Sequence, residues 1–161
     1  MEELIGACGL YCGACDNYRA FKEENAYLQL TDKFNTREKI NANECKGCHS
    51  QKLSEHCNAC TIRLCAREKG LFHCGLCSEY PCSILTQFKN EGDTWPGAKH
   101  RTLIFTNLRK LSVEGKSAWL HEMHHRWACA CGLSFTYYER TCQRCGTALN
   151  SCLERTTPEN S

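Results

Sequence analysis

The sequence predicts a small, metal-stabilised, mainly α-helical fold with irregular zinc-knuckle loops and a C-terminal β element like a zinc ribbon. Three observations lead to this fold class. Sixteen of the 161 residues are cysteine, and without them the 42% hydrophobic fraction falls to about a third, which leaves a thin apolar core. The cysteines recur at spacings that suit metal ligands. Residues that favour strands are scarce, since Val113 is the only valine.

The charge of the chain is nearly balanced. A formal net charge of +2 gives no basic excess that would by itself imply nucleic acid. Glu2 and Glu3 stand where a signal peptide needs basic residues, and no apolar run is long enough to span a membrane, so we expect a cytoplasmic protein. Thiols stay reduced in that compartment, and the dense cysteines therefore favour metal sites over disulfides.

The first cysteines, Cys8, Cys12 and Cys15, have the spacing C-x3-C-x2-C. Zinc needs a fourth ligand beside these three. The candidates are a water, a substrate, His49, His56 and His73. We expect zinc here and keep an iron-sulfur cluster as the alternative, because radical S-adenosylmethionine enzymes hold a cluster with this spacing. Their parallel barrel, however, needs more residues and more strands than this chain offers.

A stretch without cysteine follows, from Asp16 to about Ile40. Asp16 is a suitable helix N-cap, and Tyr18, Phe21 and Leu28 would share one helical face. This pattern predicts a spacer helix.

Residues 45–82 contain eight cysteines. They comprise the pair Cys45 and Cys48 and two C-x2-C-x4-C modules offset by seventeen residues, namely Cys57, Cys60, Cys65 and Cys74, Cys77, Cys82. Eight thiols suffice for two four-thiolate zinc sites, and the sequence leaves their pairing open. In each module we expect a cysteine pair on a turn and a third cysteine on a helix. The first helix would span residues 61–69, and the second would begin at Ser78 and end by Gly92.

The next stretch predicts a helical hairpin or connector. Its apolar residues have helical spacing and are Leu103, Ile104, Leu108, Leu111, Trp119, Leu120 and Met123. Residues 112–115 interrupt the pattern. His121, Glu122 and His125 match the zinc-protease motif H-E-x-x-H, but a third ligand is not evident, and we interpret them as a solvated helix face.

The last cysteine group predicts a zinc-ribbon-like module with one four-thiolate site. Its ligands would be Cys129, Cys131, Cys142 and Cys145. Gly132 and Gly146 follow the two pairs and allow the tight turns that aim backbone amides at the sulfurs. Residues 135–138 are the best strand candidate in the chain. Cys152 is either a ligand or a spare thiol.

Basic residues form two modest groups. They are Arg63, Arg67 and Lys69 in the repeats and Lys99, His100, Arg101, Arg109 and Lys110 in the connector. With Tyr137 and Tyr138 available for stacking, they suit nucleic-acid binding, and a solvated surface explains them equally well.

Four motifs in order carry a resemblance to a known family. They are Cys8-Gly9-Leu10-x-Cys12-x2-Cys15, then Cys45-x-Gly47-Cys48-His49-Ser50, then Cys57-x2-Cys60-x-Ile62-Arg63-x-Cys65-Ala66-x-Glu68-Lys69-Gly70, then Cys74-x2-Cys77-x-Glu79-Tyr80-Pro81-Cys82. Over about residues 5–90 the chain resembles the cysteine-rich "domain of unknown function 3795" family of bacteria and archaea. The resemblance implies a zinc-binding cytoplasmic protein and no particular activity.

We therefore divide the chain into a cysteine-rich multi-metal domain (1–92), a helical connector (93–126), a zinc-ribbon-like module (127–153) and a flexible tail (154–161). Our first hypothesis is a zinc-binding interaction or regulatory module with three to four Zn²⁺ sites built from the fifteen cysteines that precede Cys152. One alternative is an iron-sulfur or redox protein that uses Cys8, Cys12 and Cys15, and another is a nucleic-acid-binding zinc protein. We identify no catalytic residue and expect no membrane partner, while a protein partner remains open.

Overall fold

The computed structural model describes residues 1–23 and 25–152. Within them the chain is mainly helical, which confirms the predicted α class. The α-helices are α1 (Asp16–Lys22), α2 (Ala26–Gln29), α3 (Arg37–Ala42), α4 (Glu55–Asn58), α5 (Thr61–Glu68), α6 (Ser83–Thr94) and α7 (Ile104–Arg126). Short 3-10 helices are η1 (Glu2–Leu4), η2 (Cys12–Ala14), η3 (Cys74–Leu76) and η4 (Pro96–Leu103). The predicted tail, 154–161, lies outside the described residues.

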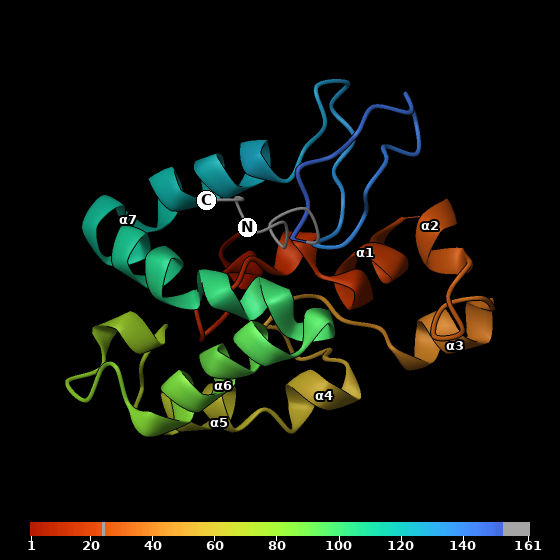
Figure 1. Ribbon diagram of the computed structural model, residues 1–161. Helices are drawn as coiled ribbons and strands as arrows, with labels where there is room; N and C mark the ends of the chain where they lie inside the picture. The colour runs from red at the N-terminus through yellow and green to blue at the C-terminus, as the bar shows by residue number, and fades with distance from the viewer. Residues whose placement is uncertain (24, 153–161) are drawn as a thin grey trace.

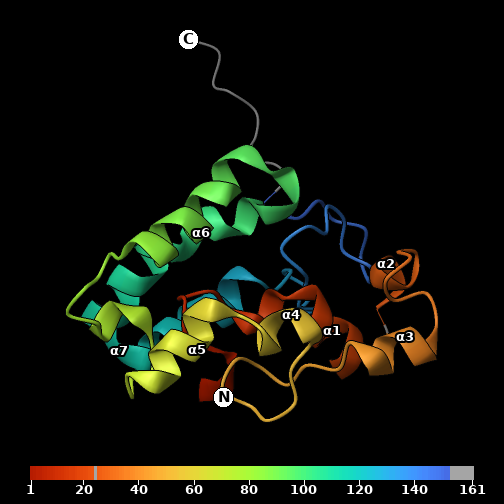
Figure 2. The same ribbon diagram turned by 90° about the horizontal axis from the view of Figure 1, so that it is seen from below.

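The N-terminal segment lies at the centre of the molecule. In Figure 1 it is flanked by α7 on one side and by the C-terminal loops above, with α4, α5 and α6 below. Figure 2 shows the same arrangement from below, with α2 and α3 together at one end. None of the helices in the described part of the chain combines the length and apolar character needed to cross a membrane.

The predicted spacer helix over residues 16–40 is wrong, because three short helices replace it. The side chain of Asn25 accepts a hydrogen bond from the Leu28 amide at 3.0 Å and begins α2. The Thr36 hydroxyl accepts from the Lys39 amide at 3.2 Å and begins α3. Each cap marks a new helix start, so one continuous helix cannot form. A small apolar cluster joins the three helices through Ala20, Leu28, Phe34 and Ile40.

The two helices of the cysteine modules differ in how well the sequence predicts them. α5 spans the predicted range to within one residue, which confirms that helix. α6 begins at Ser83 rather than at Ser78. Pro81 disfavours a helical conformation of the preceding residue, so a helix cannot run through this point. α6 also continues past Gly92 and ends at Thr94, directly before the Trp95–Pro96 step.

The two helices that the apolar spacing predicts after residue 103 are found as the two halves of α7. Its backbone leaves helical geometry at Gly115, where φ is 81°, inside the predicted interruption. The predicted apolar residues Leu103, Ile104, Leu108, Leu111, Trp119 and Met123 are buried. Both halves therefore face the interior.

Residues 127–152 form loops, and the strand predicted at 135–138 is wrong. In the described part of this segment the only β pairings are the isolated bridges Ala128–Ser134 and Thr141–Ala148. The Phe135 amide donates to the Trp127 carbonyl at 2.9 Å, whereas the Tyr137 amide donates to the distant Ala14 carbonyl at 3.0 Å. Because these amides bond to different parts of the chain, no ladder can form.

The largest apolar cluster combines residues from all three predicted units. Ile5, Tyr11 and Ala14 come from the N-terminal segment, and Leu103, Leu111, Trp119 and Met123 come from η4 and α7. The C-terminal loops add Trp127, Phe135, Tyr137, Leu149, Cys129, Cys142 and Cys152. The C-terminal loops therefore contribute to the same core as the N-terminal segment.

Tyr137 is the main link between these loops and the N-terminal segment. Its hydroxyl accepts from the Tyr11 amide at 2.9 Å and donates to the Tyr11 carbonyl at 2.7 Å. Its own carbonyl accepts from the Cys152 amide at 2.8 Å. The phenol is buried, so its hydroxyl satisfies backbone groups that water cannot reach.

Tyr137→Phe tests this link. The substitution leaves the Tyr11 amide without its partner in a buried place, and we expect the free energy of unfolding to fall by about 1–3 kcal/mol. Urea denaturation of the metal-loaded protein measures the change. Tyr27→Phe, at a half-buried tyrosine of the α1–α3 cluster, is the matched control and should change the value by less than about 0.5 kcal/mol. Equal effects of the two substitutions would contradict the proposed link.

His100, on η4, packs against the same tyrosine. Its ring stacks on Tyr137 with centroids 4.9 Å apart, and its Nδ1 hydrogen-bonds the Tyr138 hydroxyl. Burial, assisted by the positive charge of Arg101, lowers the pKa of His100 to about 4. The ring is therefore neutral in the folded protein at neutral pH.

The low pKa of His100 predicts a pH dependence of stability. In the unfolded chain this histidine has a pKa near 6.5 and takes up a proton as pH falls below that value. In the folded protein the ring takes up the same proton only when pH falls to about 4. The contribution of the neutral His100 ring to the free energy of unfolding is fully present above pH 6.5. It is lost as pH falls, by up to about 3 kcal/mol at pH 4. His100→Gln should flatten the unfolding free energy between pH 6.5 and 4, as measured by urea denaturation. His124→Gln, at an exposed position of α7, is the control and should leave the pH dependence of the unfolding free energy as it is in the unmodified protein. An equally steep pH dependence in His100→Gln would show that His100 is not the source of the effect.

Candidate metal centres

Four cysteine sulfurs converge in the C-terminal loops. The Sγ atoms of Cys129, Cys131, Cys142 and Cys145 all lie within 4.8 Å of one another. The Cys129 and Cys145 sulfurs are 3.5 Å apart, and those of Cys131 and Cys142 are 3.6 Å apart. A tetrahedral ion with metal–sulfur bonds of about 2.3 Å spaces its ligands roughly 3.8 Å apart. The four thiols can therefore bind one metal ion.

Two similar turns build this group. Each cysteine pair sits between the residues of one isolated bridge, Ala128–Ser134 or Thr141–Ala148. Gly132 and Gly146 follow the pairs with φ angles of 85° and 71°, which confirms the predicted tight turns. The bridges close the loops, and the glycines let the backbone reverse without strain, so both sulfurs of a pair face the same side.

Local hydrogen bonds favour the thiolate form that a metal requires at Cys142 and Cys145. At Cys129, in contrast, the lowering effect of the Cys131 amide is outweighed by burial and the hydrogen bond with the Cys145 thiol, which raise the pKa to about 11. The Thr147 hydroxyl lies 3.3 Å from the Cys145 sulfur, and with the Thr147 amide it lowers the pKa of Cys145 to about 6. The backbone amides of Cys145 and Arg144 lower the pKa of Cys142. Lower pKa values reduce the cost of releasing thiol protons on metal binding.

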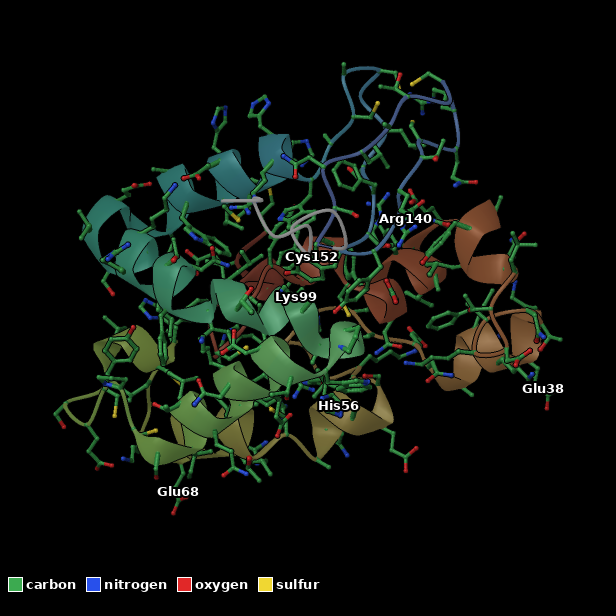
Figure 3. All side chains as sticks on the ribbon, in the orientation of Figure 1. Glu38, His56, Glu68, Lys99, Arg140 and Cys152 are labelled. Carbon is green, nitrogen blue, oxygen red and sulfur yellow. The ribbon has the colours of Figure 1, made fainter. Side chains whose placement is uncertain are left out.

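A second gathering of cysteines surrounds a central cavity of about 310 Å³. Six cysteines from three segments line it, namely Cys8, Cys12, Cys15, Cys48, Cys57 and Cys60. Aromatic rings of Tyr137, Tyr138 and Trp95 form part of its wall. His56, an exposed residue of α4, also lines the cavity (Figure 3).

The thiols around this cavity fall into two overlapping sets. Burial and the neighbouring thiol of Cys48 raise the pKa values of Cys8 and Cys12, and Cys60 raises those of Cys8 and Cys48 further. The first set therefore comprises Cys8, Cys12, Cys48 and Cys60, although Cys15 also raises the pKa of Cys12 and Cys74 that of Cys8.

The other set consists of Cys15, Cys45 and Cys57. A hydrogen bond from the Cys57 thiol lowers the pKa of Cys45 to about 6, while burial and the Asp16 carboxylate raise the pKa of Cys15 to about 11. Cys45 lies outside the lining of the cavity, so this set extends away from it.

The remaining cysteines of the modules line a smaller cavity of about 120 Å³. They are Cys65, Cys74, Cys77 and Cys82. The Lys69 ammonium lies 3.9 Å from the Cys77 sulfur and pairs with Glu79. In the described residues, only the C-terminal four bring three or more potential ligand atoms all within 4.8 Å. The cysteine groups of residues 8–82 do not reach this spacing in the described residues, and the zinc sites predicted there remain predictions.

The other candidate ligands have different surroundings. His49 stacks on Phe72 with ring centroids 4.2 Å apart, and His73 is buried. Cys152 is buried in the main apolar cluster, apart from the four converging sulfurs. None of the three joins a compact ligand group within residues 1–23 and 25–152.

The H-E-x-x-H match lies on an exposed face of α7. The Nε2 atoms of His121 and His125 are 3.2 Å apart. Glu122, which would be the general base, forms an ion pair with Lys110. Within the described chain no third ligand completes this pair, so the arrangement fits a solvated helix face.

Sequence reasoning missed the walls of the central cavity. Spacing alone brings Cys8 near Cys12, but nothing in the sequence places Cys48 and Cys60 beside them. Tyr137 and His100, noted only as surface candidates, line the cavity because the C-terminal loops fold back onto η2 and η4. These contacts join residues far apart in sequence, and no local pattern signals them.

Comparison with known proteins gives one match. The model of a family described as "Protein of unknown function (DUF3795)" matches residues 4–87, slightly more than half of the chain. No curated protein and no solved structure shows significant similarity to this chain.

The geometry of the C-terminal group predicts the effect of removing one ligand. Cys142→Ser should lower the bound metal by one equivalent per chain, because three thiolates hold an ion far less tightly than four. Elemental analysis of protein purified anaerobically measures this loss. Cys152→Ser changes another buried cysteine and should keep the full metal content. Equal metal content in Cys142→Ser and the unmodified protein would contradict the site.

Proposed function

The chain belongs to the DUF3795 family of proteins of unknown function, and from this premise we propose that it is a zinc-binding protein whose C-terminal site is structural. The convergence of four cysteine sulfurs within 4.8 Å carries the proposal. Soft thiolates in a tetrahedron suit Zn²⁺, and four protein ligands leave no open position for water or substrate. A site of this kind stabilises a fold and does not catalyse a reaction at the metal.

The surroundings of the site explain why a structural ion is needed. Each of the two turns is closed by an isolated bridge, so backbone bonding alone holds them weakly. A four-thiolate zinc site contributes about 10 kcal/mol or more to folding. Zinc would therefore hold the two turns together and keep Tyr137 in contact with the N-terminal segment.

Zinc bound at this site would also hold in place the apolar side chains that the C-terminal loops contribute to the main cluster. Trp127, Phe135, Tyr137 and Leu149 all lie in the segment that the site closes, and all are buried in the main cluster. Tyr137 and Tyr138 also form part of the wall of the central cavity. We infer a metal-scaffolded module in which the C-terminal zinc fixes one side of the cysteine-lined interior.

Removal and return of the metal test the proposal. The full chain, purified anaerobically without added metal, should contain zinc, and stripping it with a strong chelator should reduce helical circular dichroism. Zn²⁺ should restore the signal, whereas Mg²⁺ should not, because Mg²⁺ prefers oxygen ligands. Cys142→Ser should show a lower zinc content and a lower unfolding midpoint before any chelator is added. Metal-free protein with unchanged helicity and an unchanged unfolding midpoint would refute structural zinc.

A further inference from the structure

The central cavity has the size and the thiols for a larger metal group than one ion. Its volume of about 310 Å³ equals that of roughly ten water molecules. Cys8 and Cys12 reach it from the N-terminal segment, Cys48 from the loop before α4, and Cys60 from the start of α5. Cys8 and Cys60 also pack against the apolar cluster of Ile62, Leu85, Ile104 and Leu108, so this side of the cavity is shielded from water.

The spacing of the sulfurs differs between this cavity and the C-terminal site. In the described residues, the ligand atoms around the cavity do not gather within 4.8 Å, whereas the four C-terminal sulfurs do. A single zinc ion needs the closer spacing. A [4Fe–4S] cluster, in contrast, holds four cysteine sulfurs about 6 Å apart at the corners of its larger core.

The charge around the cavity suits a thiolate-ligated cluster. Lys33, Arg63 and Arg101 line it, although Arg101 is paired with Glu91, and Asp16 is the only carboxylate in the lining. A [4Fe–4S]²⁺ core with four thiolates carries a net charge of about −2, which Lys33 and Arg63 partly offset. The Arg63 guanidinium is fixed beside the thiols, because its Nε donates to the Cys48 carbonyl at 2.9 Å.

Backbone amides are also directed at the sulfurs. The Ala7 amide donates to the Cys48 sulfur at 3.3 Å. Amide–sulfur hydrogen bonds are a principal means by which proteins stabilise iron–sulfur clusters and set their potentials. The Ala7 carbonyl accepts from the Cys74 amide at 2.8 Å, so the segment that presents Cys8 is fixed on both sides.

We propose that the central cavity binds a [4Fe–4S] cluster through Cys8, Cys12, Cys48 and Cys60. The first two ligands lie in one segment and the other two come from separate segments, so the cluster would tie three parts of the chain together. Cys15 and Cys57 also line the cavity, but they group with Cys45, which lies outside it, so we do not include them among the ligands. The inference is independent of the C-terminal zinc, because the two sites share no residue.

Anaerobic reconstitution of the full chain with Fe²⁺ and sulfide tests the proposal. After desalting, iron and acid-labile sulfide are measured together with the absorption spectrum and zinc content. Cys60→Ser is the key variant, because Cys60 is the N-cap of α5 and serine is a good N-cap, so the helix should still form. Cys60→Ala is a second variant, because a serine hydroxyl can itself bind iron. Cys142→Ser is the control that removes a ligand of the other site.

The expected result is that the unmodified protein and Cys142→Ser take up about four iron and four sulfide at the cavity, with absorption near roughly 400 nm. Both Cys60 variants should lose this uptake while keeping their zinc at the C-terminal site and their helical circular dichroism. Folded, zinc-containing protein without iron and sulfide uptake would overturn the proposal. Full cluster content in Cys60→Ala would overturn it as well. Loss of zinc alone in Cys142→Ser would bear only on the proposed zinc function.

Discussion

The structure depends on the central position of the N-terminal segment and on the bonding of its backbone. Residues 7–14 contact most other parts of the molecule: Ala7 bonds to Cys74 and to the Cys48 sulfur, and Ala14 bonds to Tyr137. The Gly9 carbonyl accepts from the Asn107 side chain at 2.9 Å. Buried backbone groups need such partners, since water cannot supply them. The packing of α7, the repeats and the C-terminal loops around this segment follows from satisfying those groups.

This arrangement explains how a protein with a thin apolar core can fold. The buried hydrophobic residues are divided among three clusters, and cysteines belong to or pack against two of them. Thiols act as small apolar side chains in such places and become metal ligands when they lose their protons. The interior therefore supplies modest burial, and under the proposed function metal binding would supply further stability.

The same residue type serves two different geometries in this molecule. In the C-terminal loops, two local turns face each other, and their sulfurs approach to 3.5 and 3.6 Å. Around the central cavity, three separate segments meet, and no three of their described ligand atoms lie within 4.8 Å of one another. Tyr137 belongs to the apolar cluster that includes Cys129 and Cys142, and it also lines the central cavity.

The sequence by itself determined the local features of the protein. Cysteine spacing and the following glycines predicted the turns of the C-terminal group, apolar periodicity predicted the buried faces of α7, and the repeated cysteine module predicted α5. The tertiary structure decided which distant thiols meet and which segments are loops. Residues 135–138 have the composition of a strand, yet the Tyr137 amide bonds to Ala14 instead. Local spacing controls geometry over a few residues, whereas contacts between distant segments depend on how the whole chain satisfies its buried polar groups.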